Sequence, residues 1–188
     1  MKKSNHTALL IIDIINDFNF SNGDTLAMKT KEIAANIYSL KQLCIKENMP
    51  VIYINDHYNL WKADLDKIIS FCLNDKNDEI LDKIKPSDQD YFLIKPKHSA
   101  FYGTALHTLL QQLQVDTLLL TGIAGNICVL FTANDAYMRE YSLIIADNCI
   151  ASVDNQDNTY AIRMMQNVMD AKIFTYQENT IMSPLFPS

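Results

Sequence analysis

The sequence lacks the features of a membrane-spanning or secreted protein. No apolar run in its 188 residues approaches the length of a membrane span, and the amino-terminal segment reaches Asp13 too soon for a signal peptide. The four cysteines are widely spaced and include no C-x-x-C pair, which argues against a disulfide framework and against a cysteine-bound metal. We therefore expect a cytoplasmic protein with reduced thiols.

The sequence also lacks an excess of basic residues. Its 16 lysines and arginines are outnumbered by 22 aspartates and glutamates, which gives a formal net charge of −6. Nucleic acids and anionic membranes attract basic surfaces, so we expect neither as the main partner. No internal repeat, low-complexity tract or long linker divides the chain, and its length suits one sizeable core. We therefore predict a single domain over residues 1–188.

What the sequence contains instead is an alternation of short apolar runs with amphipathic segments. Six apolar runs are predicted as strands: 7–12, 51–54, 91–94, 117–120, 142–146 and 172–175. Helical patterns lie between them, at about 29–48, 65–73, 79–84, 104–113, from 125 onward and 161–168. Apolar strands that alternate with amphipathic helices are typical of a parallel sheet covered on both faces. The predicted fold class is α/β: a three-layer α-β-α domain with a six-stranded, mainly parallel sheet.

Cys128 stands out because of the segment that carries it, TLLLTGIAGNICVLFTA (117–133). An aliphatic run is broken by Gly122, Ala124 and Gly125 before an apolar run resumes, which is typical of a strand that turns sharply into a helix. Cys128 falls in the first turn of that helix. Free N–H groups and the positive dipole end favour an anion there, so the thiol should lose its proton more easily than in water. The alternative is a small buried cysteine that only packs.

Two other polar residues directly follow predicted strands. Asp13 stands at the end of the first strand and Lys95 at the end of the third. In parallel α/β sheets the working groups gather at the carboxyl ends of the strands, where Cys128 is also predicted. A thiol, a carboxylate and an ammonium together supply a nucleophile, a base and a charge stabiliser. Taken singly, Asp13 is also compatible with a capping role, and Lys95 with a solvated lysine.

These residues carry a resemblance to a known family. Asp13 in ALLIIDIINDF, Lys95 in KPKHSAF and Cys128 in TGIAGNICV resemble the isochorismatase-like cysteine hydrolases, which include nicotinamidases and N-carbamoylsarcosine amidase. The likeness runs from about residue 8 to about residue 174. It implies a Rossmann-like sheet and a catalytic triad. In that triad Asp13 is the general base, Lys95 the stabilising cation and Cys128 the nucleophile.

The resemblance also implies a reaction. The bond between Ile123 and Ala124 should be a cis peptide, and the backbone N–H groups of Ala124 and Cys128 should form an oxyanion hole. The implied enzyme hydrolyses a small-molecule amide or ureido C–N bond through a thioester on Cys128, without an organic cofactor. Relatives of this fold generally associate, so a homo-oligomer, either a dimer or a tetramer, is expected.

The sequence departs from part of this family pattern. Nicotinamidases hold a metal with an Asp-x-His pair, whereas Asp56 and His57 are adjacent here, so no metal is expected and a metal-dependent nicotinamidase is disfavoured. Asp56 and His57 are compatible with substrate contact or with a polar loop at the pocket rim. The Gln that many relatives carry after the first strand is absent, so no known substrate is transferred. Cys128 argues against the vinyl-ether reaction of true isochorismatases, which lack this nucleophile.

Aromatic residues flank the predicted site, as expected for a mostly apolar pocket. The predicted lining is Phe18, Trp61 and Tyr102. Phe101 and Phe131 are equally compatible with core packing. A Ser–His dyad made by His98 and Ser99 is disfavoured, because neighbours on an extended stretch point in opposite directions.

A different class of function stays open. A chain can keep this fold and triad yet serve as a non-catalytic binding or regulatory protein. A thiol-dependent esterase or a redox-responsive cysteine protein is a further alternative. The intact set of Asp13, Lys95 and Cys128 favours catalysis, because an unused reactive thiol is an oxidation hazard.

Overall fold

A computed structural model describes residues 6–178 of the chain. At its centre is a six-stranded sheet in the order β3-β2-β1-β4-β5-β6, in which each of these strands pairs in parallel with its neighbours. The strands are β1 (Thr7–Ile12), β2 (Val51–Asp56), β3 (Tyr91–Lys95), β4 (Thr117–Ile123), β5 (Ser142–Ala151) and β6 (Lys172–Phe174). The predicted α/β class is confirmed, and this sheet is wholly rather than mainly parallel.

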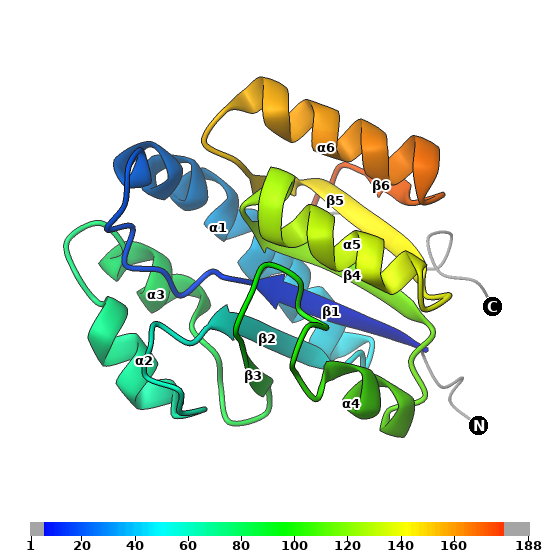
Figure 1. Ribbon diagram of the computed structural model, residues 1–188, viewed down its shortest axis with the longest axis horizontal. Coiled ribbons are helices and arrows are strands. Elements are labelled where there is room, and N and C mark those ends of the chain that lie inside the picture. The colour runs from blue at the N-terminus through cyan, green and yellow to red at the C-terminus, as the bar shows by residue number, and fades with distance from the viewer. Residues whose placement is uncertain (1–5, 179–188) are drawn as a thin grey trace.

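Helices cover both faces of the sheet, which gives three layers (Figure 1). The helices are α1 (Gly23–Lys46), α2 (Leu65–Cys72), α3 (Asp78–Ile84), α4 (Leu106–Gln112), α5 (Leu130–Tyr137) and α6 (Asn155–Val168). One core cluster joins the sheet to α1, α2 and α3, and a second joins its other face to α4, α5 and α6. In Figure 1, α4 and α5 lie in front of the sheet and α1 lies behind it.

The central strand β1 explains why the sequence has apolar runs rather than an alternating pattern. All six residues of β1 are buried. Leu9 and Ile11 belong to the core cluster on one face, whereas Leu10 and Ile12 belong to the cluster on the other. Successive side chains of a strand point to opposite faces, so a strand covered on both faces is apolar throughout.

Helix α1 begins earlier than the sequence pattern predicts. It starts at Gly23 rather than near Lys29. Asn22, at its N-cap, has a φ of 64°, and Asp24 places a negative charge in the first turn, where the helix dipole favours one. The buried Leu26 extends the apolar face toward the amino terminus. The Asn-Gly pair therefore marks a helix start and not only a loop.

Strand β4 continues past its predicted end at Leu120 and reaches Ile123. Gly122 has a φ of +106°, and a Cβ there would lie 2.1 Å from the carbonyl oxygen of Ile12. Only glycine has both the backbone freedom and the small size that this close approach requires. The end of β4 is therefore pressed against the end of β1, beside Asp13.

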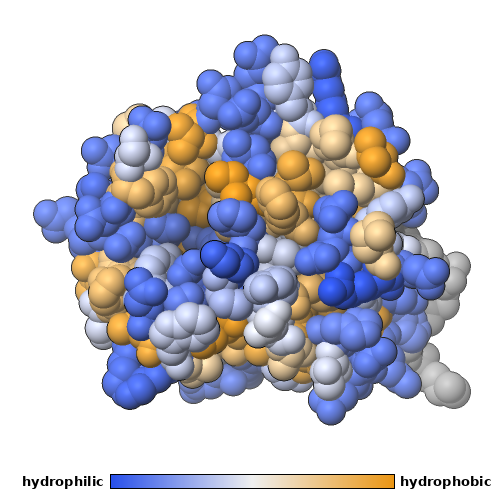
Figure 2. Space-filling model, in the orientation of Figure 1, coloured by the Kyte–Doolittle hydropathy of each residue, from blue (hydrophilic) through white to orange (hydrophobic). Residues whose placement is uncertain are grey.

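The surface carries apolar side chains among polar ones. In Figure 2, several apolar patches on this face lie over α5 and α6. Large side chains that these helices expose are Phe131, Tyr137, Tyr160, Met164 and Val168. Within residues 6–178, no helix is long and apolar enough to cross a membrane.

Candidate active site

The carboxyl edge of the sheet brings three polar side chains together. Asp13 directly follows β1, Lys95 is the last residue of β3, and Cys128 lies in the turn that follows β4. Strand β2 lies between β1 and β3, and its last residue, Asp56, pairs with Lys95. Asp13 has a φ of 50°, a conformation that aspartate tolerates better than most residues. The chain therefore turns at the point where its carboxylate enters the site.

Lys95 joins the three groups. Its Nζ lies 2.8 Å from Oδ2 of Asp13 and 3.5 Å from Sγ of Cys128, and it donates to the carbonyl oxygen of Lys97 at 3.0 Å. The other carboxylate oxygen of Asp13 accepts a hydrogen bond from the backbone N–H of Asp56 at 2.9 Å. The side chain of Lys95 is 1% exposed and that of Asp13 is 7% exposed. The carboxylate and the ammonium are thus buried as a hydrogen-bonded pair, with the sulfur beside them.

The pKa values of these groups respond to burial and to one another. Burial raises the pKa of Asp13 above its usual value, and the positive charge of Lys95 offsets part of that rise. Burial opposes the charge of Lys95, but the neighbouring Asp13 and Cys128 outweigh it, so the pKa of Lys95 is raised. Burial and the charge of Asp13 raise the pKa of Cys128, with Lys95 acting in the opposite direction.

The raised pKa favours the protonated thiol of Cys128, which lies beside the Lys95–Asp13 pair. This corrects the expectation that Cys128 loses its proton more easily than in water. The helix-terminus argument considers only the local turn, whereas burial and the nearby carboxylate act more strongly on the folded protein. A reaction that uses this sulfur as a nucleophile would need a base to remove the thiol proton, and the carboxylate of Asp13 lies close to it.

The turn that carries Cys128 is a single π-helical turn, Gly125–Val129. The peptide bond between Ile123 and Ala124 is cis. The carbonyl oxygen of Ala124 accepts hydrogen bonds from the N–H groups of Ile127 at 3.0 Å and Val129 at 3.1 Å. The carbonyl oxygen of Cys128 accepts from the hydroxyl of Thr132 at 2.7 Å. Cys128 therefore sits in the first turn after β4, with its side chain half-buried.

His98 also reaches the sulfur, although the sequence argument gives it little weight. Its Nδ1 lies 3.9 Å from Sγ of Cys128, and its ring packs against Phe131 with centroids 5.6 Å apart. The chain after Lys95 is not extended: it curls, and the N–H of Ala100 donates to the hydroxyl of Thr132 at 3.0 Å. The expected opposite directions of neighbouring side chains apply only to an extended strand. No local signal predicts this fold-back.

The predicted pocket residues occupy two different environments. Phe18 is fully buried in the core cluster that contains α1, so it packs inside the protein instead of facing an opening. Trp61 is 67% exposed and Tyr102 is 60% exposed. The ring of Trp61 stacks on His57, with centroids 4.0 Å apart. An aromatic residue near a strand end can point to either side of the chain, and sequence alone does not decide which.

Asp56 and His57 each accept a backbone hydrogen bond in the loop after β2. A carboxylate oxygen of Asp56 accepts from the N–H of Tyr58 at 2.8 Å, and Nδ1 of His57 accepts from the N–H of Asn59 at 3.0 Å. These atoms stabilise the loop after β2. In the part of the chain that the structure describes, no three side chains of His, Cys, Asp or Glu are grouped as metal ligands.

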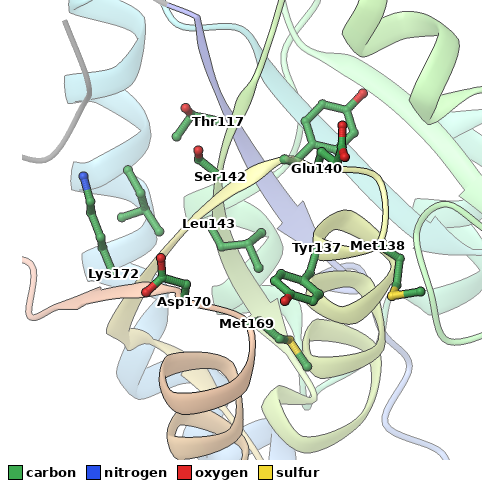
Figure 3. Close-up of a pocket in the computed structure, with 11 residues that line it drawn as sticks. Thr117, Tyr137, Met138, Glu140, Ser142, Leu143, Met169, Asp170 and Lys172 are labelled. Atoms are coloured by element: carbon green, nitrogen blue, oxygen red, sulfur yellow. The ribbon is translucent and has the colours of Figure 1, made fainter.

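A cavity lies at the opposite edge of the sheet. It has a volume of about 530 Å³ and is lined at the first residues of β4, β5 and β6, which are Thr117, Ser142 and Lys172 (Figure 3). Asp170 and Glu140 also line it. This cavity is at the amino edge, so it is separate from the three groups around Cys128.

The family of the chain follows from comparison with known proteins. The isochorismatase domain family matches residues 7–177. The isochorismatase family protein YaaI of Bacillus subtilis is 58% identical over 171 residues, which cover 91% of this chain and 94% of YaaI. The class that the fold and these matches define is the isochorismatase-like hydrolases. The chain belongs to the isochorismatase family.

Solved structures agree with this assignment. The nicotinamidase PncA of Bacillus subtilis superposes with a TM-score of 0.70 at 28% identity, over 92% of this chain and 99% of that one. N-carbamoylsarcosine amidase of Thermoplasma acidophilum has a TM-score of 0.70 at 27% identity, over 93% of this chain and 98% of that one. The α/β fold of the chain thus matches isochorismatase-like structures along nearly its whole length.

Proposed function

We propose that the protein hydrolyses a small-molecule amide or ureido C–N bond through a thioester on Cys128. The observation that carries this proposal is the position of Lys95 Nζ, 2.8 Å from Asp13 and 3.5 Å from the sulfur of Cys128. The similarity to a nicotinamidase and to N-carbamoylsarcosine amidase supports it, because both of those proteins are amidases by name.

In the first step the sulfur attacks the substrate carbonyl. Asp13 takes the thiol proton, the S–C bond forms, and the carbonyl electron pair moves onto the oxygen. The backbone N–H groups of Ala124 and Cys128 stabilise that oxyanion, each by roughly 3 kcal/mol. Lys95 stabilises the negative charge on the carboxylate before the proton transfer and on the sulfur as the thiol loses its proton.

In the second step the C–N bond breaks. The oxyanion collapses, and Asp13 gives its proton to the leaving nitrogen, which departs as ammonia or an amine. A thioester remains on Cys128. Asp13 then takes a proton from water, the hydroxide attacks the thioester, and the acid leaves as Cys128 regains its proton.

The raised pKa of Asp13 suits a group that first accepts a proton and then donates it. A carboxylate with an ordinary pKa is a weak base, whereas burial raises the pKa of Asp13 and so strengthens it as a proton acceptor. The positive charge of Lys95 limits that rise and so favours the ionised carboxylate. Burial therefore makes Asp13 a stronger base, and Lys95 keeps its pKa from rising further.

An assay for ammonia release tests the proposal. The panel is nicotinamide, simple amides, ureido acids and carbamoyl amino acids, each incubated with wild-type protein and with Cys128→Ala. We expect release from at least one compound by the wild type, and none by the variant. Equal release by both would contradict the role of Cys128. No release from any compound, with no acyl adduct on Cys128, would favour a non-catalytic binding or regulatory protein.

Cellular location and assembly belong to the same proposal. A small-molecule substrate and reduced thiols fit a cytoplasmic enzyme, and a homo-oligomer of two or four chains is expected. Light scattering on purified protein measures the assembly directly, and a monomer at micromolar concentration would contradict the prediction.

A further inference from the structure

The turn that carries Cys128 is held from behind by a polar pair. The backbone N–H of Asn126 donates to Oγ of Ser152 at 3.0 Å, and the same hydroxyl donates to Oδ1 of Asn158 at 2.7 Å. Ser152 directly follows β5 and is 1% exposed, whereas Asn158 lies near the start of α6. Two hydrogen bonds thus connect the turn, the sheet and α6.

Gly125 allows this pair to lie directly against the turn. A Cβ at Gly125 would lie 2.1 Å from Oδ1 of Asn158 and 3.1 Å from Oγ of Ser152. Gly125 is buried, and its φ is not in the left-handed region, so contact rather than backbone conformation requires glycine here. A side chain at this position must either move the turn or turn Asn158 away from Ser152.

The segment that carries the pair is itself firmly held. The carboxylate of Asp154 caps α6 by accepting from the N–H groups of Gln156 at 2.6 Å and Asp157 at 3.1 Å. Nζ of Lys29, on α1, donates to the carbonyl oxygen of Val153 at 2.7 Å. A positioning group is effective only when its own support is rigid, and this support includes elements from both faces of the sheet.

We propose that Ser152 and Asn158 are positioning residues that hold the Gly125–Val129 turn so that the backbone N–H groups of Ala124 and Cys128 face the substrate oxyanion. This inference rests on the proposed function and names the part of the fold that sets its oxyanion hole. Ser152 fixes the peptide plane between Gly125 and Asn126, and Asn158 fixes the direction of the Ser152 hydroxyl. Both hydrogen bonds of the pair act on the backbone of the turn and not on the sulfur.

Two reactions of Cys128 separate this role from general structural support. Acylation by p-nitrophenyl acetate passes through an oxyanion, so its rate depends on the aim of the turn. Alkylation by iodoacetamide displaces iodide without forming an oxyanion, so its rate depends only on the sulfur. The ratio of the two rate constants therefore reports the oxyanion hole independently of thiol reactivity.

The experiment measures both rate constants for the wild type, Ser152→Ala, Asn158→Ala and the matched control Thr159→Ala. Thr159 lies beside Asn158 on α6, and its hydroxyl donates to the carbonyl oxygen of Asn155 on the solvent side. We expect Ser152→Ala and Asn158→Ala to lower acylation by about 10- to 100-fold, less than the loss of a whole oxyanion donor. Alkylation and the control should stay within about threefold of the wild type.

A double variant tests whether Gly125 and Asn158 act through one contact. Gly125→Ala should lower acylation about as much as Asn158→Ala, because either change separates Asn158 from Ser152. The double variant Gly125→Ala/Asn158→Ala should be no slower than the slower single variant, because its clash with Oδ1 is gone. Losses that multiply in the double variant would contradict a shared contact.

The outcomes distinguish this inference from the proposed function. If the wild type forms no acetyl adduct on Cys128, the proposed function fails before the pair is tested. If the wild type is acylated and Ser152→Ala is acylated at the same rate, only the positioning role is overturned. If Ser152→Ala loses acylation and alkylation equally, the pair supports the fold or the thiol instead of the oxyanion hole.

Discussion

The two edges of the sheet differ in the chemistry of their side chains. At the amino edge, a cavity of about 530 Å³ opens beside Thr117, Ser142 and Lys172 (Figure 3). Its eleven lining residues, all within the described part of the chain, include no cysteine and no histidine. At the carboxyl edge, the ammonium of Lys95 lies within hydrogen-bonding distance of both Asp13 and Cys128.

The chemistry of the side chains therefore identifies the carboxyl edge as the candidate site. Burial at the carboxyl edge shifts the pKa of Asp13, Lys95 and Cys128, and a cluster of shifted groups is typical of catalytic sites. Parallel strands all end at this edge, so their following residues converge there. The amino edge contributes the first residues of the strands.

The largest expected effect is the loss of the nucleophile. Cys128→Ala should lower turnover on the order of 10,000-fold or more, because no other cysteine is exposed enough to replace it as the nucleophile. Cys44, Cys72 and Cys149 are buried. Mass spectrometry after brief iodoacetamide treatment should find Cys128 labelled first. Equal labelling of all four thiols would break the contrast between this edge and the rest of the molecule.

Removal of the base should have the next largest effect. Asp13→Asn keeps the size of the side chain but cannot take the thiol proton, so we expect turnover to fall by about 1,000-fold. The matched control is Asp170→Asn, which changes a carboxylate at the amino-edge cavity. A comparable loss in Asp170→Asn would mean that the amino edge takes part in the reaction.

Removal of the cation should lower the rate and shift its pH dependence. The charge of Lys95 lowers the pKa of Asp13, so Lys95→Met should raise that pKa further. Asp13 must be ionised to act as a base, so the acid limb of the pH–rate profile should move to higher pH. We expect a fall of about 100-fold at neutral pH. A profile that keeps its acid limb unchanged would argue against Asp13 as the titrating group.

His98→Ala should have a modest effect. The contact between His98 and the sulfur is 3.9 Å, and the imidazole is exposed, so we expect acylation of Cys128 to slow by about 2- to 10-fold. Lys97→Ala is the matched control, because Lys97 contacts the site through its backbone carbonyl, which the substitution keeps. A loss as large as that of Asp13→Asn would place His98 among the essential groups.

The smallest effect is expected at the amino edge. Ser142→Ala changes a polar side chain that lines the cavity, and its rate should stay within about twofold of the wild type. Its melting temperature should also stay close to that of the wild type. A selective loss of turnover with unchanged stability would show that the two edges are coupled.

Part of this protein could be predicted from local sequence alone. Strand β1 is apolar because both of its faces are covered, and that pattern is visible without coordinates. Asp13 and Lys95 stand where strands end, and parallel pairing brings such positions to one edge. Gly122 and Gly125 mark the tight path around Cys128. These signals depend only on neighbouring residues.

Other features depend on segments far apart in the chain. The proximity of His98 to Cys128 follows from a loop that folds back onto α5, and the burial of Phe18 follows from packing against α1. The polar pair behind the turn, Ser152 and Asn158, reaches the N–H of Asn126 from the segment that follows β5. A local pattern contains no information on such distances.

The sequence by itself determined the layered α/β fold and the three groups at one edge, because apolar periodicity and strand ends are local properties. Tertiary structure alone decided that the thiol of Cys128 is protonated at rest, because burial and the charge of Asp13 act on it only in the folded chain. It also decided the surroundings of Cys128, since His98 approaches the sulfur and Ser152 binds the turn that carries it, both from remote segments.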